Sequence, residues 1–386
     1  MGRIYFDNSA TTELCTRAKA KMTEAMECYG NPSSLHLAGL EAEKIVRQAR
    51  LAVCRSLGIR TPRDGELVFT SCGSEANTLA IFGTVYAKAR RTSNKILTTA
   101  GEHPAVENAL RRLEEQGFEV IRISTQGGVL DMEQIKAEAR GVLLATFMMV
   151  NNETGAAYDV TKAFKIIKAA SPDALCHSDA VQGYMKRQFS VATLGADLLT
   201  VSAHKIHGPK GVGALWISPA VLKAKKIIPW LLGGGQEFGM RSGTENTVGI
   251  AGFGGAAESC SATLSANIAH MTQLRNYIEE ELPEGVLVNR PCGERAPHIL
   301  SIRLPHIKSE TMLHFLSAKG IFISSGSACS SHSRDVSPAL EAFGLDSAAA
   351  DCTVRISLCP ENTKEEADVF LTALSEGIST LVRIRK

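Results

Sequence analysis

The sequence lacks any strong excess of charge of one sign, because 42 lysines and arginines stand against 40 aspartates and glutamates in 386 residues. This balance argues against a surface built to bind nucleic acid or a membrane. Long hydrophobic runs are also missing. The longest, GVLLATFMMV at 141–150, is roughly half of a membrane span and fits a buried strand better. The first residues, MGRIYFDNSATT, contain no apolar signal segment, so we expect a cytoplasmic protein.

Closely spaced cysteines are absent as well. The ten cysteines include no C-x-x-C pair and no tight group, which argues against a structural zinc or iron–sulfur site and favours mostly buried, unreactive thiols. Cys329 is the exception. Its neighbours in ISSGSACSSHSRDVSP (323–338) are small and polar, so we expect an exposed, mobile loop. A thiol there suits a nucleophile that reaches a site and leaves with a group attached, and an incidental surface cysteine is the alternative.

Internal repeats and low-complexity tracts are absent too, and strand-like and helix-like stretches alternate instead. From about residue 15 to 250 this alternation predicts an α/β domain with a mostly parallel sheet and helices on both faces. Residues 251–386 mix short strands with helices and predict a smaller α+β domain, which residues 1–14 join. Two long helices are expected at 37–57 and from 246 to about 282.

Lys205 lies in SAHKIHGPKG (202–211), directly after the apolar run ADLLTVSA. Strand ends are where open α/β folds place their chemistry. A partly desolvated amine there can have a lowered pKa and form a Schiff base with an aldehyde, whereas a surface lysine paired with a carboxylate is the alternative. His204 and His207 resemble a metal-binding pair, but no third ligand is evident. We therefore expect no metal.

Two further polar residues follow candidate strands. Asp179, in HSDAVQG, ends the strand before that of Lys205. A carboxylate there could keep the nitrogen of a pyridoxal ring protonated, so that the ring acts as an electron sink; a helix N-cap is the alternative. His103, in GEHPAVEN, could stack on a flat cofactor and move protons, or could be purely structural. Asp179 and Lys205 at the ends of successive strands indicate a pyridoxal site more strongly than either residue does alone.

A candidate anion site occurs in VFTSCGSEANTLAI, which has the pattern strand, glycine turn, helix start. Gly73 and Ser74 would present backbone N–H groups and a hydroxyl at the positive end of that helix. Ser202 and His204 could add donors. A capped helix without a ligand is the alternative.

In this order, these stretches resemble the cysteine desulfurases, the nitrogen-fixation and iron–sulfur-assembly class of fold-type I pyridoxal-phosphate enzymes. The resemblance runs from residue 5 to about 358 and rests on the segments YFDNSATT, GNPSSLH, TSCGSEAN, EHPAV, VNNETG, HSDAVQ, SAHKIHGPKG, GGGQEFGMRSGTEN, SSGSACSS and VRISL. It implies a large domain with a mostly parallel seven-stranded sheet, and a small α+β domain that carries the cysteine loop at about 324–338. It also implies pyridoxal 5′-phosphate, L-cysteine as substrate, a homodimer and a protein that accepts the sulfur.

The resemblance also implies roles for the cofactor residues. Lys205 would hold pyridoxal phosphate covalently, Asp179 would pair with the ring nitrogen, and Gln182 would hydrogen-bond the ring hydroxyl. His103 would stack on the ring and shuttle protons. The remaining cofactor residues would lie at the phosphate, with one of them supplied by a partner subunit. They are Gly73, Ser74, Ser202 and His204, together with Thr244 from the partner.

For the substrate, the resemblance implies that Asn152 and Arg355 grip the carboxylate, since a guanidinium offers two parallel hydrogen bonds; Asn152 would also lie against the cofactor. The freed Lys205 amine would remove the α-proton, and the Cys329 thiolate would attack the substrate sulfur. Alanine and a persulfide on Cys329 result, and the loop would carry the persulfide to its acceptor.

Alternatives remain open on the same sequence. Another fold-type I enzyme, an aminotransferase or a selenocysteine lyase, would share the cofactor residues, but an aminotransferase would not need Cys329. A non-catalytic sulfur-carrier scaffold would not need Lys205, Asp179 and His103. Gln236 and Phe238 depart from the basic or more polar pair that the resemblance leads us to expect.

Overall fold

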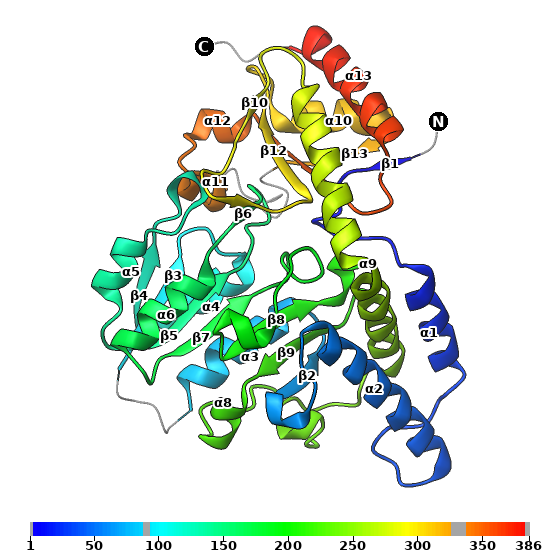
Figure 1. Ribbon diagram of the computed structural model, residues 1–386, viewed down its shortest axis with the longest axis vertical. Helices are drawn as coiled ribbons and strands as arrows, with labels where there is room; N and C mark the ends of the chain where they lie inside the picture. Colours follow the sequence, from blue (N-terminus) through cyan, green and yellow to red (C-terminus); the bar gives the residue numbers. More distant parts are fainter. Residues whose placement is uncertain (1–2, 88–92, 326–336, 383–386) are drawn as a thin grey trace.

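The computed structural model describes residues 3–87, 93–325 and 337–382. A large sheet of seven strands forms its centre (Figure 1). The strand order is β2-β9-β8-β7-β5-β3-β4, and every neighbouring pair is parallel except those made by β9. The mostly parallel seven-stranded sheet is thus confirmed. The strands are β2 (Glu66–Thr70), β3 (Lys95–Thr99), β4 (Glu119–Ile123), β5 (Val142–Met148), β7 (Leu175–Asp179), β8 (Leu198–Ser202) and β9 (Gly213–Ile217).

Helices cover both faces of this sheet, because its central strands are apolar on both sides. In β2, Leu67 and Phe69 pack into one core and Val68 into the other, as the two-residue period of a strand requires. The helices α3 (Gly73–Val85) and α4 (Pro104–Glu114) lie over the Val68 face. The opposite face is covered by α2 (Leu37–Ser56), α5 (Met132–Glu138), α6 (Val160–Ala170) and the first half of α9 (Thr247–Glu280). The two predicted long helices are α2 and α9.

A second core lies around a four-stranded antiparallel sheet of order β10-β12-β15-β14. The N-terminal strand β1 pairs with β13, and Phe6 packs against Phe370 at a ring-centroid distance of 5.7 Å, so the first residues join this core. Figure 1 shows α9 running from the large sheet to this region. The predicted domain boundaries, 15–250 against 1–14 with 251–386, stay predictions. The strands are β1 (Ile4–Tyr5), β10 (Leu287–Val288), β12 (Ile299–Arg303), β13 (Ile321–Phe322), β14 (Ser324–Ser325) and β15 (Thr353–Ser357), and the helices α10 (Ser309–Ala318) and α13 (Lys364–Thr380).

The remaining elements are short or peripheral. Helix α1 (Thr16–Met26) packs beside α9. No helix in the described ranges is long and apolar enough to cross a membrane. The other elements are β6 (Ala156–Ala157), β11 (Glu294–Arg295), α7 (Val191–Leu194), α8 (Pro219–Lys223), α11 (Pro338–Phe343), α12 (Ser347–Asp351), and the 3₁₀ turns η1 (Pro62–Asp64), η3 (Gln126–Gly128), η4 (Ala203–Lys205) and η5 (Glu237–Gly239).

Candidate active site

A cavity of about 310 Å³ lies where β2, β5, β7 and β8 end and where β15 of the small sheet approaches. Carboxyl ends of parallel strands meet at one edge of a sheet, which is where ligands bind in open α/β folds. The cavity brings together most residues that the sequence singled out, although they come from distant parts of the chain. Its lining includes Gly73, Ser74, His103, Asn152, Asp179, Gln182, Ser202, His204, Lys205 and Arg355.

Lys205 is the last residue of η4, which directly follows β8. Its Nζ donates hydrogen bonds to the carbonyl oxygens of Ser9 and Ala10, at 2.6 and 2.7 Å. The amine therefore points from the strand end into the cavity, toward the segment that follows β1. These two carbonyls have no side-chain signature, so sequence analysis did not find them.

Asp179 is the last residue of β7, and it is 7% exposed. One carboxylate oxygen accepts from Nδ2 of Asn77 at 2.7 Å, and the other accepts from the backbone N–H of Val181 at 2.9 Å. The carboxylate is thus held by two donors while it lines the cavity. Asn77 was missed from sequence, although its place in α3, one turn after Gly73, puts it on the side of the predicted anion site.

His103 caps the N-terminus of α4, where its Nδ1 accepts from the backbone N–H of Ala105 at 3.1 Å. Burial lowers the pKa of His103, Asp179 opposes this effect, and the positive charge of Lys205 adds to it. Because Nδ1 is an acceptor, the neutral ring carries its proton on Nε2. The ring can therefore both lie against a cofactor and exchange a proton through one defined atom.

Gln182 is a buried residue of the cavity lining, and its amide contacts two protein groups. Nε2 donates to the carbonyl of Ser9 at 2.9 Å, and Oε1 lies 3.2 Å from Nε2 of His298. Burial lowers the pKa of His298 well below its ordinary value, with the positive charges of Lys186 and Arg355 adding to the effect. A neutral His298 can donate to Gln182 Oε1. The predicted contact of Gln182 with a ring hydroxyl stays a prediction.

The anion end of the cavity lies at the N-terminus of α3. A Cβ on Gly73 would lie 3.0 Å from Cγ2 of Val181, so the absence of a side chain keeps this end open. Ser202 is 1% exposed, and its Oγ has no hydrogen-bond partner among the described residues. An unpaired buried hydroxyl is costly unless a ligand or water satisfies it. The pattern fits a phosphate held by helix N–H groups and hydroxyls.

His204 also borders this end, and its Nδ1 lies 3.3 Å from the hydroxyl of Thr11. Burial lowers the pKa of His204 to about 4, with the positive charges of Lys205, Lys186 and Lys210 adding to the shift. The ring is therefore neutral near pH 7 and still offers one N–H donor.

Arg355 lies on β15 and reaches the cavity from the small sheet. Nη1 donates to the carbonyl of Asn152 and Nη2 to a carboxylate oxygen of Asp7, both at 2.8 Å. Its Nε is buried without a partner among the described residues. The guanidinium is thus oriented by protein groups and keeps further N–H donors, Nε among them, which suits a carboxylate ligand.

Lys186 was missed from sequence. Lys186 is buried, at 6% exposed, and its Nζ has no hydrogen-bond partner within the described ranges. Burial lowers the pKa of Lys186 to about 7, and the positive charge of Lys205 is the next cause. An amine that loses its charge far more readily than an ordinary lysine therefore lies close to Lys205.

Two predicted residues are not placed in this cavity. Cys329 lies outside the described residues, but both flanks of its segment border the site: Ser325 lines the cavity, and the Ser337 hydroxyl donates to the carboxylate of Glu153, another lining residue, at 2.6 Å. Thr244 lines a separate hollow near the N-terminus of α9. Its predicted role requires a second subunit and stays a prediction.

The two departures from the expected sequence pattern lie at one turn: Gln236 directly precedes η5, and Phe238 lies within it. The amide of Gln236 accepts from the backbone N–H of Gly243 at 2.8 Å, so it ties this turn to the segment containing Thr244. Phe238 is 60% exposed, and the guanidinium of Arg50 lies 5.0 Å from its ring centre. Neither side chain lines the main cavity.

The residues present fit pyridoxal phosphate. The cavity offers an amine at one strand end, a carboxylate held by two donors at the next, a histidine ring with a defined Nε2 proton, and an anion cradle with an unsatisfied buried hydroxyl. These are the groups that such a cofactor needs: a covalent anchor, a ring-nitrogen partner, a stacking surface and a phosphate site.

Comparison with known proteins gives a consistent picture. The family described as aminotransferase class-V matches residues 4–370. A cysteine desulfurase of Trichormus azollae is 38% identical over 99% of this chain and 94% of its own length, and the cysteine desulfurase IscS of Dictyoglomus turgidum is 35% identical over 98% and 95%. A solved NifS-like protein superposes with a TM-score of 0.90 at 36% identity, covering 98% of this chain and all of the other. The structure described as SspA in complex with cysteine has a TM-score of 0.78 at 30% identity, covering 93% and 100%.

Proposed function

The chain belongs to the cysteine desulfurases of the aminotransferase class V family, and from this premise we propose that Lys205 holds pyridoxal 5′-phosphate and that Cys329 takes the sulfur of L-cysteine. The observation that supports the proposal best is the meeting of Lys205, Asp179 and Arg355 in one cavity. Asp179 ends β7 and Lys205 lies in the turn after the neighbouring strand β8, whereas Arg355 comes from β15. A covalent anchor, a ring partner and a carboxylate clamp thus face the same space.

When bound, pyridoxal phosphate supplies an electron sink that allows an α-proton to leave and a carbon–sulfur bond to break. Asp179, held by Asn77 and the Val181 N–H, would keep the ring nitrogen protonated. Gly73, Ser74, Ser202 and His204 would bind the phosphate, and Ser202 would thereby gain the partner that its buried hydroxyl lacks.

Arg355 and Asn152 would orient the substrate through its carboxylate. The guanidinium is already fixed by two hydrogen bonds, so little conformational freedom remains to be lost on binding. The amine of Lys205, once released, would take the α-proton, and His103 would exchange a proton through Nε2.

Cys329 would complete the reaction as a thiolate. Its Sγ forms a bond to the sulfur of L-cysteine while the Cβ–S bond of the substrate breaks, and the electron pair of that bond stays with the substrate fragment. Protonation of this fragment gives L-alanine, and the sulfur remains on Cys329 as a persulfide. A protein that accepts this sulfur and a homodimer that contributes Thr244 belong to the same proposal and rest on the resemblance. The expected cytoplasmic location stays a prediction.

The test is turnover of L-cysteine by the purified chain, with alanine and sulfide measured together in the presence of a thiol reductant. We expect equal amounts of both products, loss of both in Cys329→Ala, and normal rates in Cys292→Ser, which removes an exposed thiol. An aminotransferase would instead transfer the amino group to a 2-oxo acid and release no sulfide. Sulfide release that survives in Cys329→Ala would contradict the role of Cys329.

A further inference from the structure

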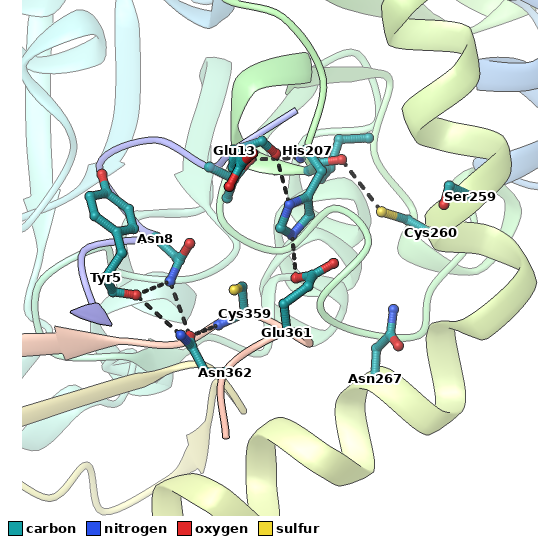
Figure 2. Close-up of polar contacts among 12 residues, drawn as sticks. Tyr5, Asn8, Glu13, His207, Ser259, Cys260, Asn267, Cys359, Glu361 and Asn362 are labelled. Carbon is teal, nitrogen blue, oxygen red and sulfur yellow. Dashed lines mark hydrogen bonds and ion pairs between the residues drawn. The ribbon is translucent and has the colours of Figure 1, made fainter. Parts of the chain in front are cut away.

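A second group of chemically reactive side chains lies outside the main cavity. His207, Cys359 and Glu361 each place one possible ligand atom, a ring nitrogen, a thiol sulfur and a carboxylate oxygen, within 4.8 Å of the other two (Figure 2). His207 lies two residues after Lys205, whereas Cys359 and Glu361 lie in the loop between β15 and α13. The cluster therefore joins the Lys205 segment of the large sheet to the end of the strand that carries Arg355.

The orientation of the His207 ring is fixed by a neighbour that can only accept. Nδ1 lies 3.0 Å from the carbonyl oxygen of Glu13, so Nδ1 carries the hydrogen and Nε2 of the neutral ring presents a lone pair. The backbone N–H of His207 also donates to the Thr12 hydroxyl at 2.7 Å, and its φ is 65°, in the left-handed region. A non-glycine residue held in this region is unusual.

Nε2 of His207 faces a carboxylate oxygen of Glu361 at 3.6 Å (Figure 2). This separation is too long for a hydrogen bond. It is close to the roughly 3.4 Å between two ligands placed tetrahedrally at about 2.0–2.1 Å from one zinc ion. Two lone-pair groups at this spacing attract a cation between them.

The third group, Cys359, is held in place by its own loop. Its backbone N–H donates to Oδ1 of Asn362 at 2.8 Å, and Asn362 also accepts from Asn8 and donates to Glu366. Cys359 is 8% exposed, whereas the Glu361 side chain is 66% exposed. All three candidate ligands border a surface hollow that also contains Glu13 and Lys210, and this hollow offers a path from solvent.

We propose that Nε2 of His207, Sγ of Cys359 and one carboxylate oxygen of Glu361 bind a zinc ion, with solvent as the fourth ligand. Imidazole, thiolate and carboxylate together are a ligand set that zinc takes in tetrahedral geometry. Binding forms the zinc–sulfur bond and releases the thiol proton to solvent. The carbonyl of Glu13 serves as the outer partner that keeps the imidazole in the ligating tautomer.

The structure also explains why the sequence pair His204 and His207 did not reveal this site. The two rings diverge: His204 borders the main cavity and contacts Thr11, whereas only His207 contacts Glu13 and faces Glu361. The other two ligands come from a loop far along the chain. The ion would link the segment that follows Lys205 to the loop that follows β15. It would thereby fix the position of Lys205 relative to Arg355 without contacting the substrate.

The test uses the full chain, stripped with a chelator and titrated with Zn²⁺ alone against a competing chromophoric indicator. We expect one tightly bound zinc per chain in the parent protein and in the control Cys292→Ser. Glu361→Gln, an exposed substitution that leaves the fold intact, and Cys359→Ser should each weaken zinc binding at least about tenfold. X-ray absorption at the zinc edge should show one sulfur ligand, and this ligand should disappear in Cys359→Ser.

Two results would overturn the proposal: no tight zinc in the parent chain, or unchanged zinc affinity in both Glu361→Gln and Cys359→Ser. The second result would mean that zinc binds elsewhere on the chain. Because the measurement is of zinc and not of sulfide, it is independent of whether the proposed desulfurase mechanism holds.

Discussion

Lys205 and Gln182 donate hydrogen bonds to the same acceptor, the carbonyl oxygen of Ser9. The backbone N–H of Ser9 is itself bonded to the Ser357 hydroxyl at 2.8 Å, at the end of β15. The segment after β1 thus connects the strand ends of the large sheet to the strand that carries Arg355. It positions the amine before any ligand binds.

Arg355→Lys is expected to lower kcat/KM for L-cysteine about ten- to a hundredfold, mainly through a higher KM. A lysine keeps the charge but loses the planar fork and cannot contact Asp7, Asn152 and a substrate carboxylate together. One lost charge-assisted hydrogen bond corresponds to about 1.5–3 kcal/mol. Steady-state alanine formation measures the effect.

The matched control for this prediction is Arg303→Lys, on the neighbouring strand β12 and outside the cavity. It should retain the parent kinetics. An unchanged KM in Arg355→Lys would show that Arg355 does not bind the substrate carboxylate.

Asn77→Ala is expected to weaken pyridoxal phosphate binding about tenfold, because the carboxylate of Asp179 loses one of its two donors. The cofactor absorbance should also titrate at a different pH, since Asp179 would hold the ring nitrogen less firmly. A purely structural role of Asn77 would lower thermal stability without moving this titration. Asn108→Ala, an exposed asparagine on α4, serves as the control and should change neither quantity.

Lys186→Met is expected to stabilise the protein, and more so at low pH. The pKa of Lys186 falls from 10.5 to about 7 on folding, mainly through burial. The cost of keeping this amine buried is therefore fully present below about pH 7 and disappears as the pH rises toward 10.5. The gain in the free energy of unfolding should be on the order of 1–3 kcal/mol near pH 6 and should vanish near pH 10.5.

Urea unfolding at fixed protein concentration measures this gain. Lys223→Met, at an exposed position of α8, should show no comparable pH dependence. A gain in Lys186→Met that does not change with pH would show that the Lys186 amine keeps its ordinary pKa in the folded protein.

The sequence predicted those parts of the fold and site that depend on local pattern. Apolar runs marked the central strands, because parallel strands are buried on both faces. Lys205 and Asp179 were found because each lies at the end of a strand that the sequence predicted. Strand β9 is antiparallel to both of its neighbours in an otherwise parallel sheet. The pattern of apolar residues predicts that a strand forms, but it does not predict the direction in which that strand runs.

Other parts of the site depend on contacts between distant segments and were beyond sequence analysis. The carbonyls of Ser9 and Ala10 are backbone groups that any residue could supply. Asn77 reaches Asp179 only because α3 packs across the end of β7. His207 lies close to Cys359 and Glu361 only because the segments that carry them pack together in the folded chain. The spacing of these residues in the sequence does not predict this contact.

The covalent attachment of the cofactor at Lys205 is the claim on which the rest of the site depends. Borohydride reduction of the protein loaded with pyridoxal phosphate, followed by proteolysis and mass spectrometry, tests it directly. We predict one labelled peptide, containing SAHKIHGPK with the label on Lys205, and no label in Lys205→Ala. A label on Lys186 or another lysine, or no label at all, would contradict the account.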